Sequence, residues 1–492
     1  MYFCVQKTGN MDKENNNGYR HILKYTSVFG SVQGLNIMAA LVRNKFAAVL
    51  LGSVGMGFAS LLLTWQNFIT QTTNLGISFG AVPSLSELYE RKDELGLRRQ
   101  IVVIRTWSLL AAVLGAFLCM VASPLMNMAV ASSQNQTLYF ALVAPAIAMM
   151  AIAGGETAIL KATRQLKALA KVQLVATLAS VVVSIPLYYL MGVDGVVPVM
   201  ILMALVTMFA TIGYSYRRYP MEISLSRQIY ADGRSMVLLG IAFSVAAIVG
   251  QVGEIFLRLF LNNYGELSEV GLYNAAYTLT VSYSALVLAA VESDFFPRLS
   301  AVCRDRWVAV DVVNRQVEVL VLLLSPMLTA LIVLLPLLVP MLYTGQFSSI
   351  VPMAQLSAIA MFFKSLSLPV CYLPLANKDS RSFLVLEISY WVYFLALFAV
   401  GYMQWGLWGT GVAIVVAHAI EWLMAVAWTY KRYQYRLSSS MMQPVVCQML
   451  LVGLTYLVSV LLSGYYYWIV GCFLMTISIA YSCCLLYRKR KG

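Results

Sequence analysis

Charged side chains interrupt several stretches of this chain that are otherwise apolar. A charge at the centre of a bilayer costs about 2.5–3.5 kcal/mol on insertion scales, so such residues tend to face a cavity or a charged partner. The residues singled out among them are Arg43, Lys45, Glu156, Glu254, Arg258, Glu292, Lys364, Glu387, His418 and Glu421. They are the first candidates for a binding or ion-coupling site.

Four of them, Arg43, Lys45, Arg258 and Lys364, are cations that can hold an anionic substrate. A guanidinium binds phosphate through paired hydrogen bonds, and a lysine adds a point charge. We therefore predict a cationic substrate-binding cavity built from these four side chains. A structural interpretation stays open, because long side chains near helix ends can reach the headgroups and Arg258 follows Glu254 by one helical turn.

Glu156, Glu254, His418 and Glu421 are the candidates for ion coupling. His418 and Glu421 are three residues apart and share a helix face, so they can relay protons or form a hydrogen bond between packed helices. Glu156 shortly precedes Lys161, which makes an ion pair at a helix end the simpler interpretation. The chain shows no catalytic arrangement and its eight cysteines have no metal-ligand spacing, so we expect no enzyme, metal or cofactor.

The composition is that of a membrane protein. Of the 492 residues, 60% are hydrophobic and 11% are charged, and the mean hydropathy is +0.77. Soluble proteins average about 25% charged residues, so an ordinary globular class is excluded. The net charge of +13 is expected to lie in cytoplasmic loops and does not predict nucleic-acid binding.

Apolar segments of about 20 residues are long enough to cross a bilayer, and the chain has fourteen of them. They lie near 25–48, 55–82, 101–125, 137–160, 172–191, 195–215, 235–260, 270–296, 317–342, 350–374, 383–402, 406–430, 444–463 and 465–486. Alternate loops collect lysine and arginine, while the others are short and nearly free of cations. This pattern predicts that both termini are cytoplasmic.

Four short matches recur in order about 215 residues apart, which indicates an internal duplication. Arg43 corresponds to Arg258, and the Pro-x-Leu-Ser at 83–86 corresponds to that at 297–300. The offset spans six helices, so the halves are parallel repeats, as in alternating-access transporters. We predict an all-α polytopic membrane protein with two parallel six-helix lobes and a C-terminal helix pair.

The corresponding domain boundaries follow from the segments and loops. They are a cytoplasmic N-terminal segment at 1–20, an N-lobe at 21–218, a cytoplasmic linker at 219–234, a C-lobe at 235–432, and the extra helix pair with a basic tail at 433–492.

Three motifs resemble a known family. The first helix ends in KFAAVLLGxxGxG at 45–57, the next carries NLGIS at 74–78, and EVGLY stands at 269–273. The chain resembles the Wzx-type polysaccharide flippases of the multidrug/oligosaccharidyl-lipid/polysaccharide (MOP) exporter superfamily. The resemblance covers essentially the whole chain.

The resemblance implies two lobes in a bacterial inner membrane that translocate undecaprenyl-diphosphate-linked oligosaccharides by alternating access. Such flippases supply O-antigen, capsule or exopolysaccharide assembly, so membrane lipids, the polysaccharide polymerase and the chain-length machinery are the implied partners. Fourteen helices instead of twelve resemble the lipid II flippase branch, whose last two helices form a groove for the lipid tail. A peptidoglycan-precursor flippase and a cation-coupled multidrug exporter therefore stay open as alternatives.

Overall fold

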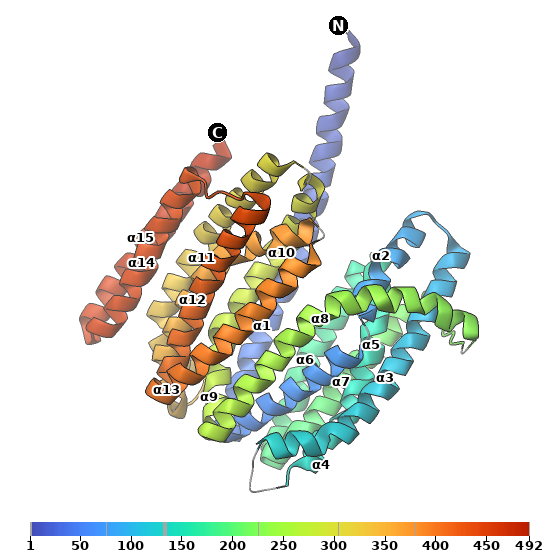
Figure 1. The fold of residues 1–492 in the computed structure, drawn as a ribbon, viewed down its shortest axis with the longest axis horizontal. Coiled ribbons are helices and arrows are strands. Elements are labelled where there is room, and N and C mark those ends of the chain that lie inside the picture. The colour runs from blue at the N-terminus through green and yellow to red at the C-terminus, as the bar shows by residue number, and fades with distance from the viewer. Residues whose placement is uncertain are drawn as a thin grey trace. The chain divides into compact units, whose positions relative to one another are not determined.

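The computed structural model describes residues 2–74, 76–130, 135–224, 226–303, 305–377 and 379–491 (Figure 1). Within these ranges the chain is helical and contains no strand, which confirms the predicted all-α polytopic class. Nine helical stretches of the described chain are long and apolar enough to cross a membrane. Two of them, Lys167–Tyr216 and Ser380–Tyr433, each cover two of the predicted segments.

The helices of the described residues overlap the predicted segments. In order they are α1 (Tyr2–Thr73), α2 (Ile77–Glu90), α3 (Glu94–Val130), α4 (Thr137–Leu142), α5 (Ala144–Ala162), α6 (Leu166–Met191), α7 (Val196–Tyr216), α8 (Arg227–Tyr264), α9 (Leu267–Tyr277), α10 (Tyr283–Val302), α11 (Arg306–Leu342), α12 (Val351–Ala376), α13 (Ser380–Tyr433), α14 (Ser439–Leu461) and α15 (Gly464–Lys491), with the short turns η1 (Gly192–Gly195), η2 (Thr278–Ser282) and η3 (Gly345–Ile350). The chain forms two compact units. The first contains Met1–Ala47, Thr72–Ser123 and Leu138–Phe243, and the second contains Ala48–Gln71, Pro124–Thr137 and Ser244–Gly492.

Sharp turns between successive helices recur at the spacing of the duplication. Gly192, between α6 and α7, and Gly406, inside α13, have φ angles of 57° and 58° and lie 214 positions apart. A glycine adopts this left-handed region without the cost that a Cβ would impose. Each is followed by a second glycine three residues later, Gly195 and Gly409. The same turn chemistry therefore joins corresponding helix pairs in the two halves.

A reciprocal contact within the second unit gives the duplication a geometric counterpart. A Cβ at Gly57 of α1 would lie 2.0 Å from the backbone oxygen of Leu267, and one at Gly271 of α9 would lie 1.9 Å from that of Ser53. Gly57 and Gly271 are 214 positions apart, and so are Ser53 and Leu267. The two contacts are therefore the same contact made from each repeat, as happens at a two-fold axis.

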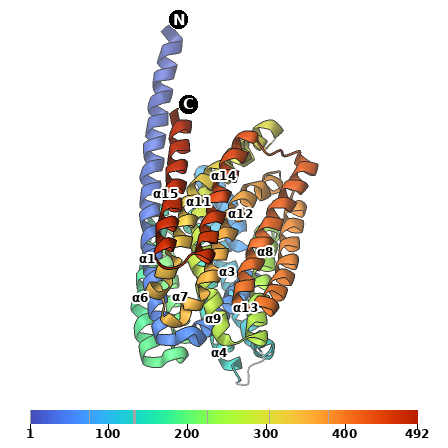
Figure 2. The ribbon, with the colours of Figure 1, turned by 90° about the vertical axis from the view of Figure 1, so that its left-hand side faces the viewer.

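A carbonyl that a proline leaves without its helical donor helps to join the C-terminal helix pair to α11. Pro336 has no N–H to donate to the carbonyl of Ile332, and an unsatisfied carbonyl is costly inside a membrane. The Tyr467 hydroxyl of α15 donates to Ile332 O at 3.2 Å and to Val333 O at 2.7 Å, and Gln355 Nε2 donates to Ile332 O at 3.1 Å. Figures 1 and 2 show α14 and α15 beside α11.

Asp379 joins the two ends of α13. Its carboxylate accepts hydrogen bonds from the backbone N–H and hydroxyl of Ser382 and from the Tyr433 hydroxyl, and it pairs with Arg432 at 2.7 Å. Burial alone would raise the pKa of Asp379, but these hydrogen bonds and the charge of Arg432 outweigh it and lower the pKa to about 2. The carboxylate therefore caps the start of α13 and fixes the end of its second half.

Replacing Gly57 or Gly271 by alanine tests the crossing of α1 and α9. Each added methyl group would meet a backbone oxygen, which cannot rotate away, so we expect a loss of about 1–3 kcal/mol in the free energy of unfolding. Gly453→Ala in α14 is the matched control, because nothing lies within 4 Å of its Cβ position. Thermal unfolding of the purified protein in detergent should show lower midpoints for the two crossing variants only.

The Asp379 assembly should make stability depend on pH in a defined direction. Because the folded-state pKa lies below the ordinary value of 3.8, the charged carboxylate stabilises the fold above pH 4. This contribution should disappear as the pH falls toward 2. Wild type should therefore unfold at a higher temperature than Asp379→Asn at pH 6, and the two curves should converge near pH 2. If the difference in unfolding temperature between the two proteins were the same at every pH, the stabilising role of the Asp379 carboxylate would be contradicted.

Candidate functional site

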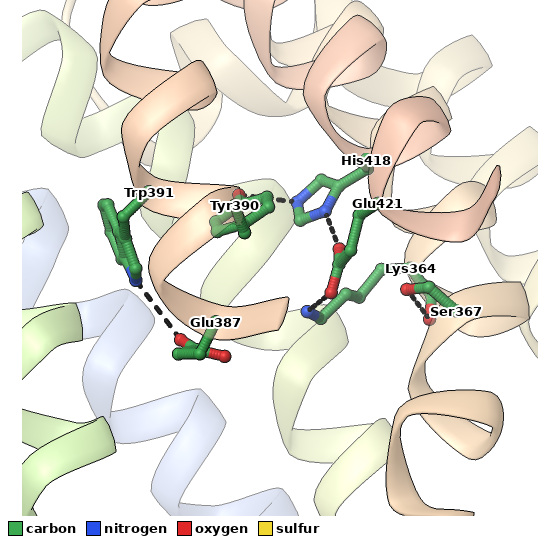
Figure 3. Close-up of polar contacts among 7 residues, drawn as sticks. All are labelled: Lys364, Ser367, Glu387, Tyr390, Trp391, His418 and Glu421. Carbon is green, nitrogen blue, oxygen red and sulfur yellow. Dashed lines mark hydrogen bonds and ion pairs between the residues drawn. The ribbon is translucent and has the colours of Figure 1, made fainter. Parts of the chain in front are cut away.

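The second unit holds a partly buried cluster of titratable side chains, which we call the Lys364 cluster (Figure 3). Its members are Lys364, Glu387, Tyr390, His418 and Glu421. Lys364 stands near the middle of α12. The other four stand on α13, which turns back on itself at Gly406. The turn therefore brings two helix halves and α12 together around the charges.

Glu421 lies between two partners and uses one oxygen for each (Figure 3). Lys364 Nζ donates to Oε1 at 2.8 Å, and His418 Nδ1 lies 2.8 Å from Oε2. His418 and Glu421 therefore share a helix face, as their spacing predicts. Their side chains are 7% and 10% exposed, while that of Lys364 is 28% exposed. The ammonium is the member of this triad that an incoming solute reaches most easily.

Tyr390 covers the other side of the imidazole. Its ring stacks on that of His418 with centroids 5.3 Å apart, and its hydroxyl lies 3.5 Å from His418 Nε2. Lys364 Nζ lies 5.6 Å from the same tyrosine ring, within the range of a cation–π interaction. Both nitrogens of the imidazole therefore face groups that can exchange a proton with them.

Glu387 adds a second carboxylate to the cluster. It accepts a hydrogen bond from Trp391 Nε1 at 3.2 Å, one helical turn along α13. One ammonium thus stands among two carboxylates and an imidazole. With both carboxylates ionised and the imidazole neutral, the cluster has a net charge of −1.

Two cavities within the second unit open onto Lys364 and Glu387. The larger has a volume of about 300 Å³ and is also lined by Tyr277, Tyr390 and His418. The smaller measures about 160 Å³ and is also lined by Glu421. Polar side chains on the walls of both provide partners for water, which needs two to four of them. The charged groups are therefore accessible to small polar solutes although they stand in membrane-spanning helices.

Arg258 and Glu254 form a second buried pair on α8. Arg258 Nη1 contacts Glu254 Oε2, and its Nε donates to Ser60 Oγ of α1 at 2.8 Å. Glu254 Oε1 accepts from the Tyr277 hydroxyl at 3.2 Å. Because Tyr277 also lines the larger cavity, it connects this pair to the Lys364 cluster. The pairing of Arg258 with Glu254 agrees with the structural alternative and leaves a substrate role untested.

Arg43 and Lys45 stand on α1 in the first unit and are half-buried. The predicted cationic cavity needs residues of both units, Arg43 from the first and Arg258 from the second, and it stays a prediction. The structure thus brings Lys364, His418 and Glu421 together, and it links Arg258 and Glu254 to them through Tyr277.

Glu156 is held by an arginine that the sequence did not single out. Arg105 of α3 contacts it through Nε at 2.8 Å and Nη2 at 3.3 Å, with both side chains no more than 3% exposed. Arg105 also donates to the carbonyls of Tyr219 and Pro220. Glu156 is therefore paired across helices and not with Lys161, the partner that proximity in sequence favoured.

Breaking this pair tests whether Glu156 is structural. Glu156→Ala would leave Arg105 buried without its anion, so we expect a loss of about 3–5 kcal/mol in the free energy of unfolding. A double variant with methionine at both positions should recover most of that loss, because it removes both charges. Membrane yield and thermal unfolding in detergent measure both effects. A Glu156→Ala protein as stable as wild type would contradict the structural role.

Known proteins resemble the chain in part of its sequence and in its fold. A family profile described as "Polysaccharide biosynthesis protein" matches residues 134–352. No curated protein matches the chain. Among solved structures, the lipid II flippase MurJ in an inward closed conformation has a TM-score of 0.71 at 12% identity and covers 96% of this chain and 100% of its own.

Two further structures are transporters of the MOP superfamily. A multidrug resistance MATE family transporter in an inward-facing conformation has a TM-score of 0.66 at 14% identity and covers 81% of this chain and 94% of its own. A MOP superfamily transporter from Pyrococcus furiosus has a TM-score of 0.59 at 12% identity and covers 83% of this chain and 94% of its own. The chain therefore has the MOP-superfamily fold and carries the polysaccharide biosynthesis pattern in residues 134–352, which confirms the resemblance predicted from its sequence.

Proposed function

We propose that the chain is a flippase that moves undecaprenyl-diphosphate-linked oligosaccharide units across the bacterial inner membrane by alternating access, for O-antigen, capsule or exopolysaccharide assembly. The polysaccharide biosynthesis pattern and the transporter fold support this proposal. The observation that carries it is Lys364, an accessible ammonium that opens onto two cavities inside apolar helices.

In this proposal Lys364 binds the diphosphate, and the polyprenyl chain remains in lipid. A hydrogen bond between a charged donor and phosphate is worth about 1.5–3 kcal/mol, which offsets part of the cost of placing the charged headgroup inside the membrane. Arg258, Arg43 and Lys45 are proposed as further cations along the route. The polymerase and chain-length machinery would receive the product on the periplasmic side, and both termini would be cytoplasmic.

Two alternatives have specific support. MurJ covers more of this chain than the multidrug transporter does, which favours a lipid flippase and keeps a lipid II-type precursor as a substrate. Glu387 favours a cation-coupled multidrug exporter, because a carboxylate in a cavity attracts cationic drugs. Glu254 and Glu421 favour it less, since each already has a cationic partner.

The test is the accumulation of lipid-linked glycans in a deletion strain complemented with variants. We expect Lys364→Met to lower translocation at least tenfold at normal membrane levels, because the anion loses its charged donor. Lys364→Arg should restore part of the activity. Lys431→Met is the matched control, because Lys431 is exposed at the last turn of α13. Arg43→Ala and Arg258→Ala test the two arginines in the same strain.

Other outcomes would point to other functions. Full complementation by Lys364→Met would place the anion site elsewhere. Accumulation of lipid II in the deletion strain would identify the peptidoglycan branch. Unchanged lipid-linked glycans together with sensitivity to cationic dyes would support the exporter.

A further inference from the structure

An anion that enters the Lys364 cluster meets an unfavourable charge balance. This inference rests on the proposed function, because it concerns the same ammonium. Lys364 Nζ already donates to Glu421 Oε1 at 2.8 Å. Glu387 lines both cavities onto which the ammonium opens. A phosphate on Lys364 would therefore stand beside two carboxylates and displace one of them from its cation. Such an uncompensated buried carboxylate is strongly destabilising.

The geometry offers Glu421 a substitute for its lost cation. His418 Nδ1 lies 2.8 Å from Glu421 Oε2, and the imidazole lines the larger cavity beside the Tyr390 hydroxyl. A proton from cavity water can therefore reach either Glu421 or His418, and in both cases it neutralises the surplus negative charge. A histidine between a carboxylate and a hydrated cavity is suited to this transfer.

We propose that binding of a phosphate-type anion at Lys364 is accompanied by the uptake of one proton by the Glu421–His418 pair. The anion takes the place of the Glu421 carboxylate on the ammonium. The pair then binds a proton supplied by solvent, as an O–H on Glu421 or an N–H on His418, and releases it when the anion leaves. No other bond is made or broken, and no further reactant is needed.

The surroundings of the pair identify the other groups that could titrate. From α12 they are Lys364 and Cys371, from the first half of α13 Glu387, Tyr390 and Tyr393, and from α9 Tyr277. Among these Glu387 is the competing carboxylate, and its hydrogen bond to Trp391 distinguishes it from Glu421. A glutamine substitution at each position separates the two.

The experiment measures equilibrium binding of radiolabelled sulfate to the purified full chain between pH 6 and pH 8. Sulfate is a tetrahedral dianion whose charge is constant over this range. Wild type should bind sulfate more tightly by up to about tenfold for each unit of falling pH, as one linked proton requires. Glu421→Gln should bind with little pH dependence, and Glu387→Gln should keep the wild-type slope. Thermal unfolding verifies that each variant is folded.

The outcomes separate this inference from the proposed function. Binding that Lys364→Met abolishes but pH leaves unchanged would overturn the proton linkage and support the anion site. If sulfate binding loses its pH dependence in Glu387→Gln and keeps it in Glu421→Gln, the assignment to the Glu421–His418 pair would be overturned. Sulfate binding that depends on the sodium concentration and not on pH would overturn this assignment as well. Unaltered sulfate binding by Lys364→Met would remove the anion site, and with it the basis of the proposed function.

Discussion

The cost of placing charge inside a bilayer governs how these helices pack. Three ion pairs among the described residues meet this constraint: Arg105–Glu156, Arg258–Glu254 and Lys364–Glu421. The cationic side chain is 3% exposed in the first, 9% in the second and 28% in the third. The first pair, Arg105–Glu156, is therefore closed off from solvent and holds its helices together. The third has the same chemistry, but its ammonium remains accessible, so an external anion can compete for it.

The polar groups of the backbone are under a similar constraint, because they also need hydrogen-bond partners inside the membrane. The positive φ angles of Gly192 and Gly406 let the chain turn sharply between successive helices. Tyr467 of α15 and Gln355 of α12 satisfy the carbonyl that Pro336 leaves without a donor, and the bond from Tyr467 attaches the C-terminal helix pair. Prolines and glycines thus determine where helices turn and where they join, while the buried charges determine which faces meet.

Much of the fold could be predicted from local signals, and the site only in part. Hydrophobic length revealed the membrane segments, and a spacing of three residues placed His418 and Glu421 on one face. The partners Lys364 and Glu421 lie 57 positions apart and Arg105 and Glu156 lie 51 apart, so no periodic pattern connects them. Arg105 was missed because it stands near the start of the predicted segment 101–125, where a solvated arginine is the ordinary expectation. Glu387, Tyr390 and Trp391 occupy positions i, i+3 and i+4, a signal that could have drawn attention to this face.

In the proposed flippase, a proton that accompanies the anion affects the energetics of export. The inside-negative potential favours outward movement of negative charge, by about 2.3 kcal/mol for each elementary charge at a potential of 100 mV. One linked proton cancels one charge, so a substrate with two or more negative charges still gains from the potential. Moving that proton outward costs about 1.4 kcal/mol for each unit by which the periplasm is more acidic. The linkage therefore suits a substrate with at least two negative charges, such as a diphosphate, and it disfavours a monoanion. The charge balance of Lys364, Glu387 and Glu421 thus bears on substrate choice as well as on affinity.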